Sequence, residues 1–378
     1  MSKPKFEQLV AANPSEAAWL HFGRLSSQTL CRRLIQARWP DLDDTRLGIK
    51  ADGLASAVRS AIGYWQTATP TLNAKVLTRY YALLQVSIAE QVSSSDPAED
   101  LNSVQRHTEQ GHGFAALQSV DGEFPHNYYV ACMQSGHFPA YLAARGLGVS
   151  TIAFERRPRS WEKLGPADRA KLISLSDLLL RVPEVQGIAE ECLGRSALSF
   201  QVGHANKNHE EFSFGARPKP AVGERKITYG ALYVDPDKVS VDQLNSLGLP
   251  FKNFEIETDK PSDTRYYVGE LEHPAADLWW DHFPHHKSDY CGTATIAPFW
   301  GITDVFALHL ATMYALSIVV RYLPSIWHRV EYGDLDHVRA LIEHYLSVLD
   351  NIGPALAVER ITGTKVIVAT PGSLTAPI

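Results

Sequence analysis

Residues Val305–Trp327 read VFALHLATMYALSIVVRYLPSIW and form an almost wholly apolar run. No charged residue lies between Asp304 and Arg321, so the run predicts a helix that is buried nearly all round. Its charge-free part spans about sixteen residues, fewer than the roughly twenty that a bilayer crossing needs. We therefore expect a core helix and no membrane span. The helix should end near Tyr322, and the chain should turn at Pro324, because a proline disfavours helical geometry in the residue before it.

Such a helix needs partners that can cover it, and amphipathic segments at both ends of the chain can supply them. Apolar residues at three- and four-residue spacing predict helices in residues 16–25, 27–39, 51–67, 72–92 and 335–352. Gly353 and Pro354 should end the last of these helices. Short β-rich runs between residues 196 and 298 predict strands.

We therefore predict an α+β fold in which N- and C-terminal helices form a helical bundle and a mixed α/β lobe is inserted between them. The expected parts are an N-terminal helical part (1–122), a mixed lobe (123–302) and C-terminal helices that complete the helical core (303–378).

Composition excludes disordered and fibrous proteins. The chain has 378 residues, 45% of them hydrophobic and 21% charged, as in ordinary globular proteins. Its formal net charge of -6 gives no global basic field, so contact with nucleic acid would need a local patch. The N-terminus lacks the apolar core of a signal peptide and the four cysteines are scattered, so we expect a cytoplasmic protein with reduced thiols. Phosphate-binding loops, nucleophile elbows and dinucleotide fingerprints are absent from the sequence, and we expect no cofactor.

Four segments together resemble the YaaC-like family of bacterial proteins. They are Arg79-Tyr80-Tyr81, Gly111-His112-Gly113, LSDLLLRVPEV (175–185) and ALSIVVRYLPSIW (315–327). They follow the same order as in the family over most of the chain. The resemblance implies an architecture more firmly than an activity. The helical parts of the family are similar to HEPN domains, which often act as metal-independent ribonucleases that use an Arg and a His with four to six residues between them.

Three Arg–His pairs fit this spacing: Arg106 with His112, Arg321 with His328, and Arg339 with His344. A histidine can take the 2′-hydroxyl proton of RNA while an arginine stabilises charge on the phosphate. Chance alone gives about this number of pairs, so each needs support from geometry.

Geometry separates the three pairs. The third pair points roughly 140° apart on a regular helix and would need a dimer to complete a site. Arg321 and His328 flank the turn at Pro324, unless Arg321 only caps helix carbonyls. Arg106 and His112 lie where a helix meets a glycine turn, where His112 could instead bond locally.

Two further segments carry candidate binding residues. WWDHFPHHKSDYC (279–291) contains His282, His285, His286 and Cys291, but no recognised ligand spacing, so we assign no metal and expect an aromatic loop. FERRPRSWEK (154–163) gathers Arg156, Arg157, Arg159 and Trp161, a set suited to phosphate contact and base stacking. The alternative for this loop is an exposed charged segment balanced by its two glutamates.

Two functions remain open at this point, and the sequence leaves open whether the protein is an enzyme. The lack of a strong site favours a non-enzymatic binding or scaffold protein with a protein or RNA partner. The alternative is a HEPN-type metal-independent ribonuclease in stress response or defence against foreign genetic elements, as a monomer or homodimer. Its candidate catalytic residues are Arg106, His112, Arg321 and His328. Convergence of His112 with Arg321 or His328 in one polar cleft would favour the enzyme.

Overall fold

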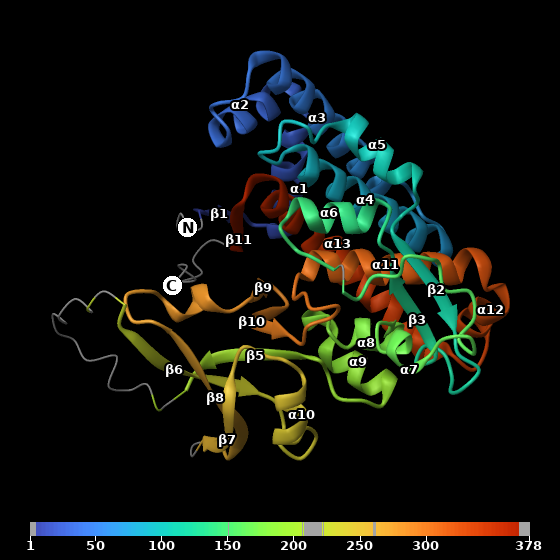
Figure 1. Cartoon of the computed structure of the whole chain (residues 1–378), viewed down its shortest axis with the longest axis vertical. Helices are drawn as coiled ribbons and strands as arrows, with labels where there is room; N and C mark the ends of the chain where they lie inside the picture. Colours follow the sequence, from blue (N-terminus) through green and yellow to red (C-terminus); the bar gives the residue numbers. More distant parts are fainter. Residues whose placement is uncertain are drawn as a thin grey trace. The chain divides into compact units, whose positions relative to one another are not determined.

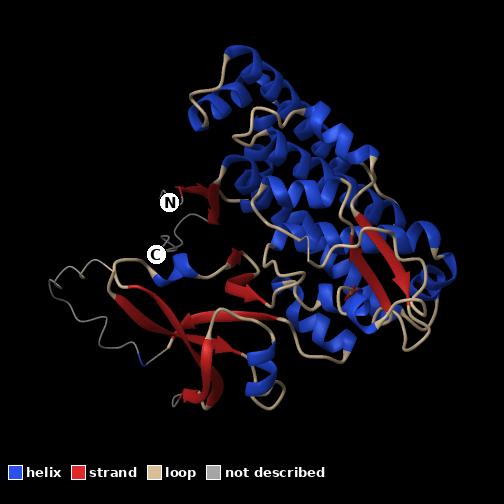
Figure 2. Ribbon diagram, in the orientation of Figure 1, coloured by secondary structure: helices blue, strands red, loops and turns tan. Residues whose placement is uncertain are grey.

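The computed structural model describes residues 5–149, 151–205, 207, 221, 223–259 and 262–369. The chain forms two compact units. The first joins Met1–Ser176 to His309–Ile378, and the second is Asp177–Leu308. Helices dominate the first unit and strands the second, which confirms the α+β class (Figure 2). The boundaries expected at residues 122 and 302 stay predictions.

The N-terminal helices of the first unit begin at side chains that cap them. Asn13, Ser27, Asp43, Thr71 and Asp100 each accept a hydrogen bond from the free backbone N–H groups of the helix that follows. These helices are α1 (Pro14–Gly23), α2 (Gln28–Arg38), α3 (Asp44–Gln66), α4 (Leu72–Val92) and α5 (Leu101–Glu109), with a 3₁₀ turn at Arg24–Ser26.

The apolar run forms helix α11 (Val305–Tyr322), and every residue from Val305 to Ser317 is buried. It ends at the predicted residue, and Pro324 begins the next helix, α12 (Pro324–Tyr332), in the first-turn position that proline tolerates. By length and composition α11 could cross a membrane, with a mean hydropathy of 1.5, but 78% of its residues are buried inside the protein. A buried core helix has the same composition.

Helix α13 (Asp336–Thr362) corrects one prediction, because it continues through Gly353 and Pro354 and ends at Gly363. Proline removes one N–H group and strains the turn before it. Here both residues are buried, and a side chain at residue 353 would meet the Trp65 ring of α3 at 2.2 Å. Tertiary packing therefore outweighs the local cost. The left-handed cap that ends the helix is Gly363, with φ +69°.

Contacts between α13 and the N-terminal helices confirm that the two ends of the chain share one helical core. In Figure 1 the red helix α13 lies beside the blue helix α1. The Asp350 carboxylate of α13 accepts hydrogen bonds from Trp65 Nε1 of α3 at 2.9 Å and from Arg79 Nε of α4 at 2.6 Å. Strands β1 (Lys5–Val10) and β11 (Thr364–Ala369) pair in parallel beside these helices.

A small antiparallel sheet belongs to the same unit. It consists of β2 (Phe114–Gln118), β3 (Tyr128–Cys132) and β4 (Ile173–Ser174). Helix α6 (His137–Ala144) follows β3, and the short helices α7 (Pro166–Arg169) and α8 (Leu175–Leu179) come later in the chain. The sheet joins the helical core because Tyr314 of α11 donates its hydroxyl to the carbonyl of Phe114, at 3.2 Å.

The second unit is built on an antiparallel sheet with the strand order β7-β8-β6-β5-β10-β9. Its strands are β5 (Ser199–His204), β6 (Arg225–Tyr233), β7 (Lys252–Asp259), β8 (Thr264–Pro274), β9 (His286–Ser288) and β10 (Cys291–Ile296). Alternating residues of these strands, among them Phe200, Leu232 and Tyr267, form its core. The helical segments of the unit are η2 (Pro183–Val185), α9 (Gln186–Leu193), α10 (Val241–Ser246) and η4 (Trp279–His282).

Candidate functional site

The glycine turn at Gly111-His112-Gly113 is held by the start of helix α6. The carbonyls of Gly111 and His112 accept hydrogen bonds from the backbone N–H groups of His137 and Phe138, at 2.9 and 3.1 Å. These are among the first N–H groups of α6, which lack partners within their own helix. Gly113 has φ +83°, and a Cβ there would lie 2.3 Å from Pro139 Cδ. Only glycine fits at this crossing of two backbones, and the crossing fixes the direction of the His112 side chain.

Two buried tyrosines flank the His112 ring. Tyr80 of α4 lies edge-on to it with ring centroids 5.6 Å apart, and Tyr314 of α11 lies at 6.4 Å. The two tyrosine rings are 6.0 Å from each other. Helices from opposite ends of the chain thus converge on one imidazole.

The charge of the Arg321 guanidinium affects the pKa values of the same side chains. Burial, and secondly the positive charge of Arg321, lower the pKa of His112 below its usual value. Burial raises the pKa of Tyr80, and the charge of Arg321 opposes that change. Arg321 donates Nε to the Ser317 carbonyl at 3.0 Å and Nη2 to the Ser317 hydroxyl at 3.1 Å. Within the described part of the chain it forms no ion pair with a carboxylate, so its charge is not neutralised.

Two polar atoms at this site lack partners. Among the described residues, His112 Nδ1 and the Tyr128 hydroxyl are buried and form no hydrogen bond. An unpaired buried polar atom costs free energy, which a ligand that bonds to it can recover. Positive charge on Arg157 and Arg321 opposes the rise in the pKa of Tyr128 that burial causes. We call His112, Tyr80, Tyr128, Tyr314 and Arg321 the His112 site.

The structure thus joins one member from each of two predicted pairs. Arg106 is exposed on α5, near the end of that helix. His328 is exposed on α12 and packs against Tyr332 one turn away, with ring centroids 5.5 Å apart. Arg339 pairs with Glu343 on its own helix. Only the sequence spacing supports roles for Arg106 and His328, which stay predictions.

The basic loop presents three exposed arginines, Arg156, Arg157 and Arg159. Trp161 is already engaged, because its ring stacks on Tyr129 with centroids 4.5 Å apart and the Arg169 guanidinium lies 4.8 Å from it. A base that stacked on Trp161 would have to displace one of them. The proposed phosphate contact by this loop therefore rests on its arginines, of which Arg157 carries a charge that lowers the pKa of Tyr128 against the effect of burial.

The histidines of the segment 279–291 contact different partners and do not gather at one point. His282 pairs with Asp277 at 2.9 Å, and Nδ1 of His285 lies 3.2 Å from the carbonyl of Phe283. The ring of His285 also lies among aromatic neighbours, as an aromatic loop predicts. His286 and Cys291 instead approach a residue from a distant part of the sequence, Glu184.

Sequence reasoning missed several residues of these sites. Tyr128 and Tyr314 carry hydroxyls inside apolar segments, and Glu184 is a lone carboxylate in the apolar segment LRVPEV (180–185). The sequence feature that could have identified them is a polar residue inside an apolar run, because a polar group that becomes buried needs a partner or a ligand.

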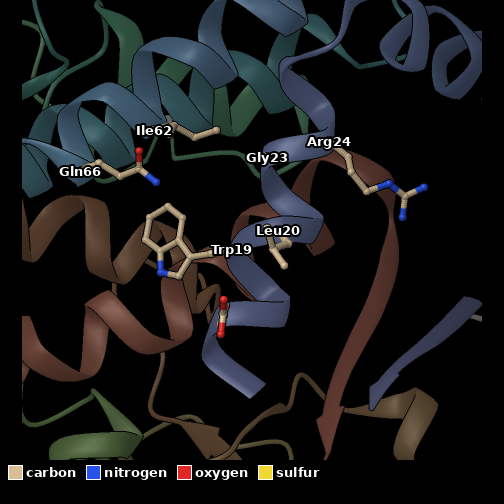
Figure 3. A pocket seen from close by; sticks show the side chains of 7 residues that line it. Trp19, Leu20, Gly23, Arg24, Ile62 and Gln66 are labelled. Carbon is tan, nitrogen blue, oxygen red and sulfur yellow. The ribbon is translucent and has the colours of Figure 1, made fainter. Parts of the chain in front are cut away.

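A hollow of about 450 Å³ lies elsewhere in the first unit, between α1 and α3 (Figure 3). Trp19, Leu20 and Ile62 contribute apolar walls, and Arg24 and Gln66 contribute polar groups. None of the predicted site residues lines it, and its lining holds no base beside a nucleophile. We assign it no chemistry.

Fold and site together define a mostly helical α+β protein with a half-buried His–Arg–Tyr site. Residues 24–361 match the model of the family described as YaaC-like protein. The match covers most of the chain, and the chain belongs to this family. No curated protein and no solved structure matches it.

Proposed function

We propose that the His112 site binds an RNA phosphodiester and cleaves it without a metal ion, as HEPN-type ribonucleases do. The observation that carries the proposal is the position of His112, whose Nδ1 has no partner, between Tyr80 of α4 and Tyr314 of α11, the helix that also carries Arg321. Convergence of distant polar residues at one place is what a catalytic site requires.

The lowered pKa of His112 suits a general base. A base must be unprotonated at the working pH, and burial and Arg321 keep this imidazole neutral near pH 7. In the proposed step His112 takes the proton of the 2′-hydroxyl, and the 2′-oxygen attacks phosphorus. The 5′-oxygen leaves and takes a proton from water, which produces a 2′,3′-cyclic phosphate and a 5′-hydroxyl.

Positive charge and a hydroxyl donor would stabilise the phosphate during this step. Arg321 has an unneutralised guanidinium, and the unpartnered hydroxyl of Tyr128 can donate to a phosphate oxygen. Arg157 adds a second cation near Tyr128. This local charge matters because the chain as a whole carries a formal charge of -6.

A second function, binding of a phosphate-bearing partner without cleavage, is favoured by one observation. A second histidine would be the usual acid for the leaving oxygen, and His137 is the nearby one. Its Nε2 lies 2.7 Å from the Ser87 hydroxyl, its side chain is buried, and burial lowers its pKa to about 3. His137 is thus neutral near pH 7 and supplies no proton, a state that fits binding better than catalysis.

The test is incubation of the purified full-length chain with total RNA and tRNA in the presence of EDTA. We expect cleavage to survive chelation and to fall about 10²–10⁴-fold in His112→Ala. Arg321→Met should lose cleavage as well, whereas His337→Ala, at an exposed position on α13, serves as the control and should stay active. Each variant is first checked for native circular dichroism and melting temperature.

The pH profile and a binding assay separate the two functions. Cleavage should rise with pH through a midpoint below about 6.5, the usual histidine value, since the pKa of His112 is lowered. RNA binding that Arg321→Met weakens, with no cleavage at high protein concentration, would establish the binding function instead. Absence of both binding and cleavage would overturn both proposals.

A further inference from the structure

Three potential metal ligands meet in the second unit. Glu184 comes from η2, His286 from β9 and Cys291 from β10, and one ligand atom of each lies within 4.8 Å of the other two. His286 Nε2 is 2.5 Å from Glu184 Oε1. Residues 286 and 291 are brought together by the β9–β10 pairing, while Glu184 is about a hundred residues earlier in the sequence.

All three groups are withdrawn from water. The Glu184 side chain is 0% exposed and that of His286 is 12% exposed, while Cys291 is 7% exposed as a residue. Burial of a carboxylate is costly unless a cation or donors compensate it. A protonated His286 would compensate Glu184, and a metal cation would compensate both the carboxylate and a deprotonated Cys291.

We propose that Glu184, His286 and Cys291 bind a zinc ion. Carboxylate, imidazole and thiolate are ligands that Zn²⁺ accepts in tetrahedral sites. One carboxylate and one thiolate balance the charge of the ion, so the filled site is neutral and suits a buried position. The Ser288 hydroxyl lies 3.4 Å from Cys291 Sγ and can donate to it, as outer groups of zinc sites do for their sulfur ligands.

Three protein ligands leave one tetrahedral position for water or a fourth ligand. Structural zinc sites are usually closed by four protein ligands, whereas three ligands and an open position are typical of sites that bind a small molecule. The site lies in a different compact unit from His112, so this proposal does not rest on the proposed ribonuclease. EDTA in the ribonuclease assay would remove the zinc but would not act on the His112 residues.

Cobalt substitution tests the site directly. The purified full-length protein is stripped with chelator, and Co²⁺ or Zn²⁺ is added. We expect one equivalent of metal to bind, with a near-ultraviolet sulfur-to-cobalt charge-transfer band and a higher melting temperature. Cys291→Ser should abolish the band, and His286→Gln should weaken binding at least 10-fold.

Matched controls come from the same unit. Cys192→Ser removes a half-buried cysteine of α9, and His282→Gln removes a histidine that pairs with Asp277. Both should bind metal as the unchanged protein does. If Cys291→Ser does not fold, loss of the melting-temperature rise in Glu184→Gln and His286→Gln decides the question. The proposal is overturned if the unchanged protein binds less than one equivalent, or if the band persists in Cys291→Ser or disappears in Cys192→Ser.

Discussion

Asp350 offers the sharpest test of the shared helical core. Its carboxylate joins three helices, because it accepts from Trp65 Nε1 of α3 and from Arg79 and Lys75 of α4, with Lys75 Nζ at 3.0 Å. The Arg79 side chain is only 9% exposed and that of Asp350 is 26% exposed. Asp350→Ala would leave the Arg79 guanidinium buried without a counter-charge.

The expected cost follows from that burial. Loss of one partner of a fully buried ion pair costs about 3–5 kcal/mol. Partial exposure of Asp350 screens the pair, so we expect about 2–4 kcal/mol. For a unit of this size each kcal/mol lowers the melting temperature by roughly 2–4 °C, so the loss should be roughly 5–15 °C.

Glu343→Ala on the same helix is the matched control. Glu343 pairs with Arg339 one turn away at 2.9 Å, and both side chains are more than 40% exposed. Surface pairs of this kind contribute roughly 0.5 kcal/mol or less. Urea unfolding followed by helical circular dichroism measures both variants, and a cycle with Arg79→Met isolates the coupling. If Asp350→Ala costs no more than Glu343→Ala, the carboxylate does not hold the two ends of the chain together.

Two other predictions concern the region around the His112 site. Burial lowers the pKa of His137 from 6.5 to about 3, so the unfolded chain takes up this proton first. The free energy of unfolding should therefore be highest above pH 6.5 and should fall as the pH drops toward 3. In acid titrations, His137→Gln should make that fall smaller. Gly113→Ala should lower the free energy of unfolding by about 2–4 kcal/mol, because φ is positive there and the new Cβ would clash with Pro139. Gly111→Ala should lower it by about 1 kcal/mol, because φ is +101° but the space around it is open. Equal losses in denaturant melts of the two variants would contradict the crossing of backbones.

Much of the fold could be predicted because its signals are local. The buried helix α11 follows from a charge-free apolar run, and its end follows from Pro324. The α+β class follows from the change between helical and strand periodicity along the chain. These features depend on residues a few positions apart, which a sequence shows directly.

The end of α13 shows where local signals fail. Gly353 and Pro354 predict a helix end, yet the helix continues because both residues are buried and Gly353 lies against Trp65, from a helix nearly three hundred residues earlier. A local preference of a few kcal/mol is overcome by burial that the sequence does not display.

The candidate sites divide in the same way. The sequence names His112, Arg321, His286 and Cys291, because these residue types carry the relevant chemistry wherever they occur. Spacing along the sequence puts His112 and Arg321 in two different Arg–His pairs. It gives no sign that Glu184 lies near His286 and Cys291, because spacing measures distance only along the chain. Packing of α11 against α4 and β2 brings His112 beside the helix that carries Arg321, and the second unit's own fold places Glu184 beside the β9–β10 hairpin. The sequence therefore shows which residue types can carry the chemistry. Which of these side chains lie beside one another is decided by long-range packing, because such contacts form only when the chain has folded.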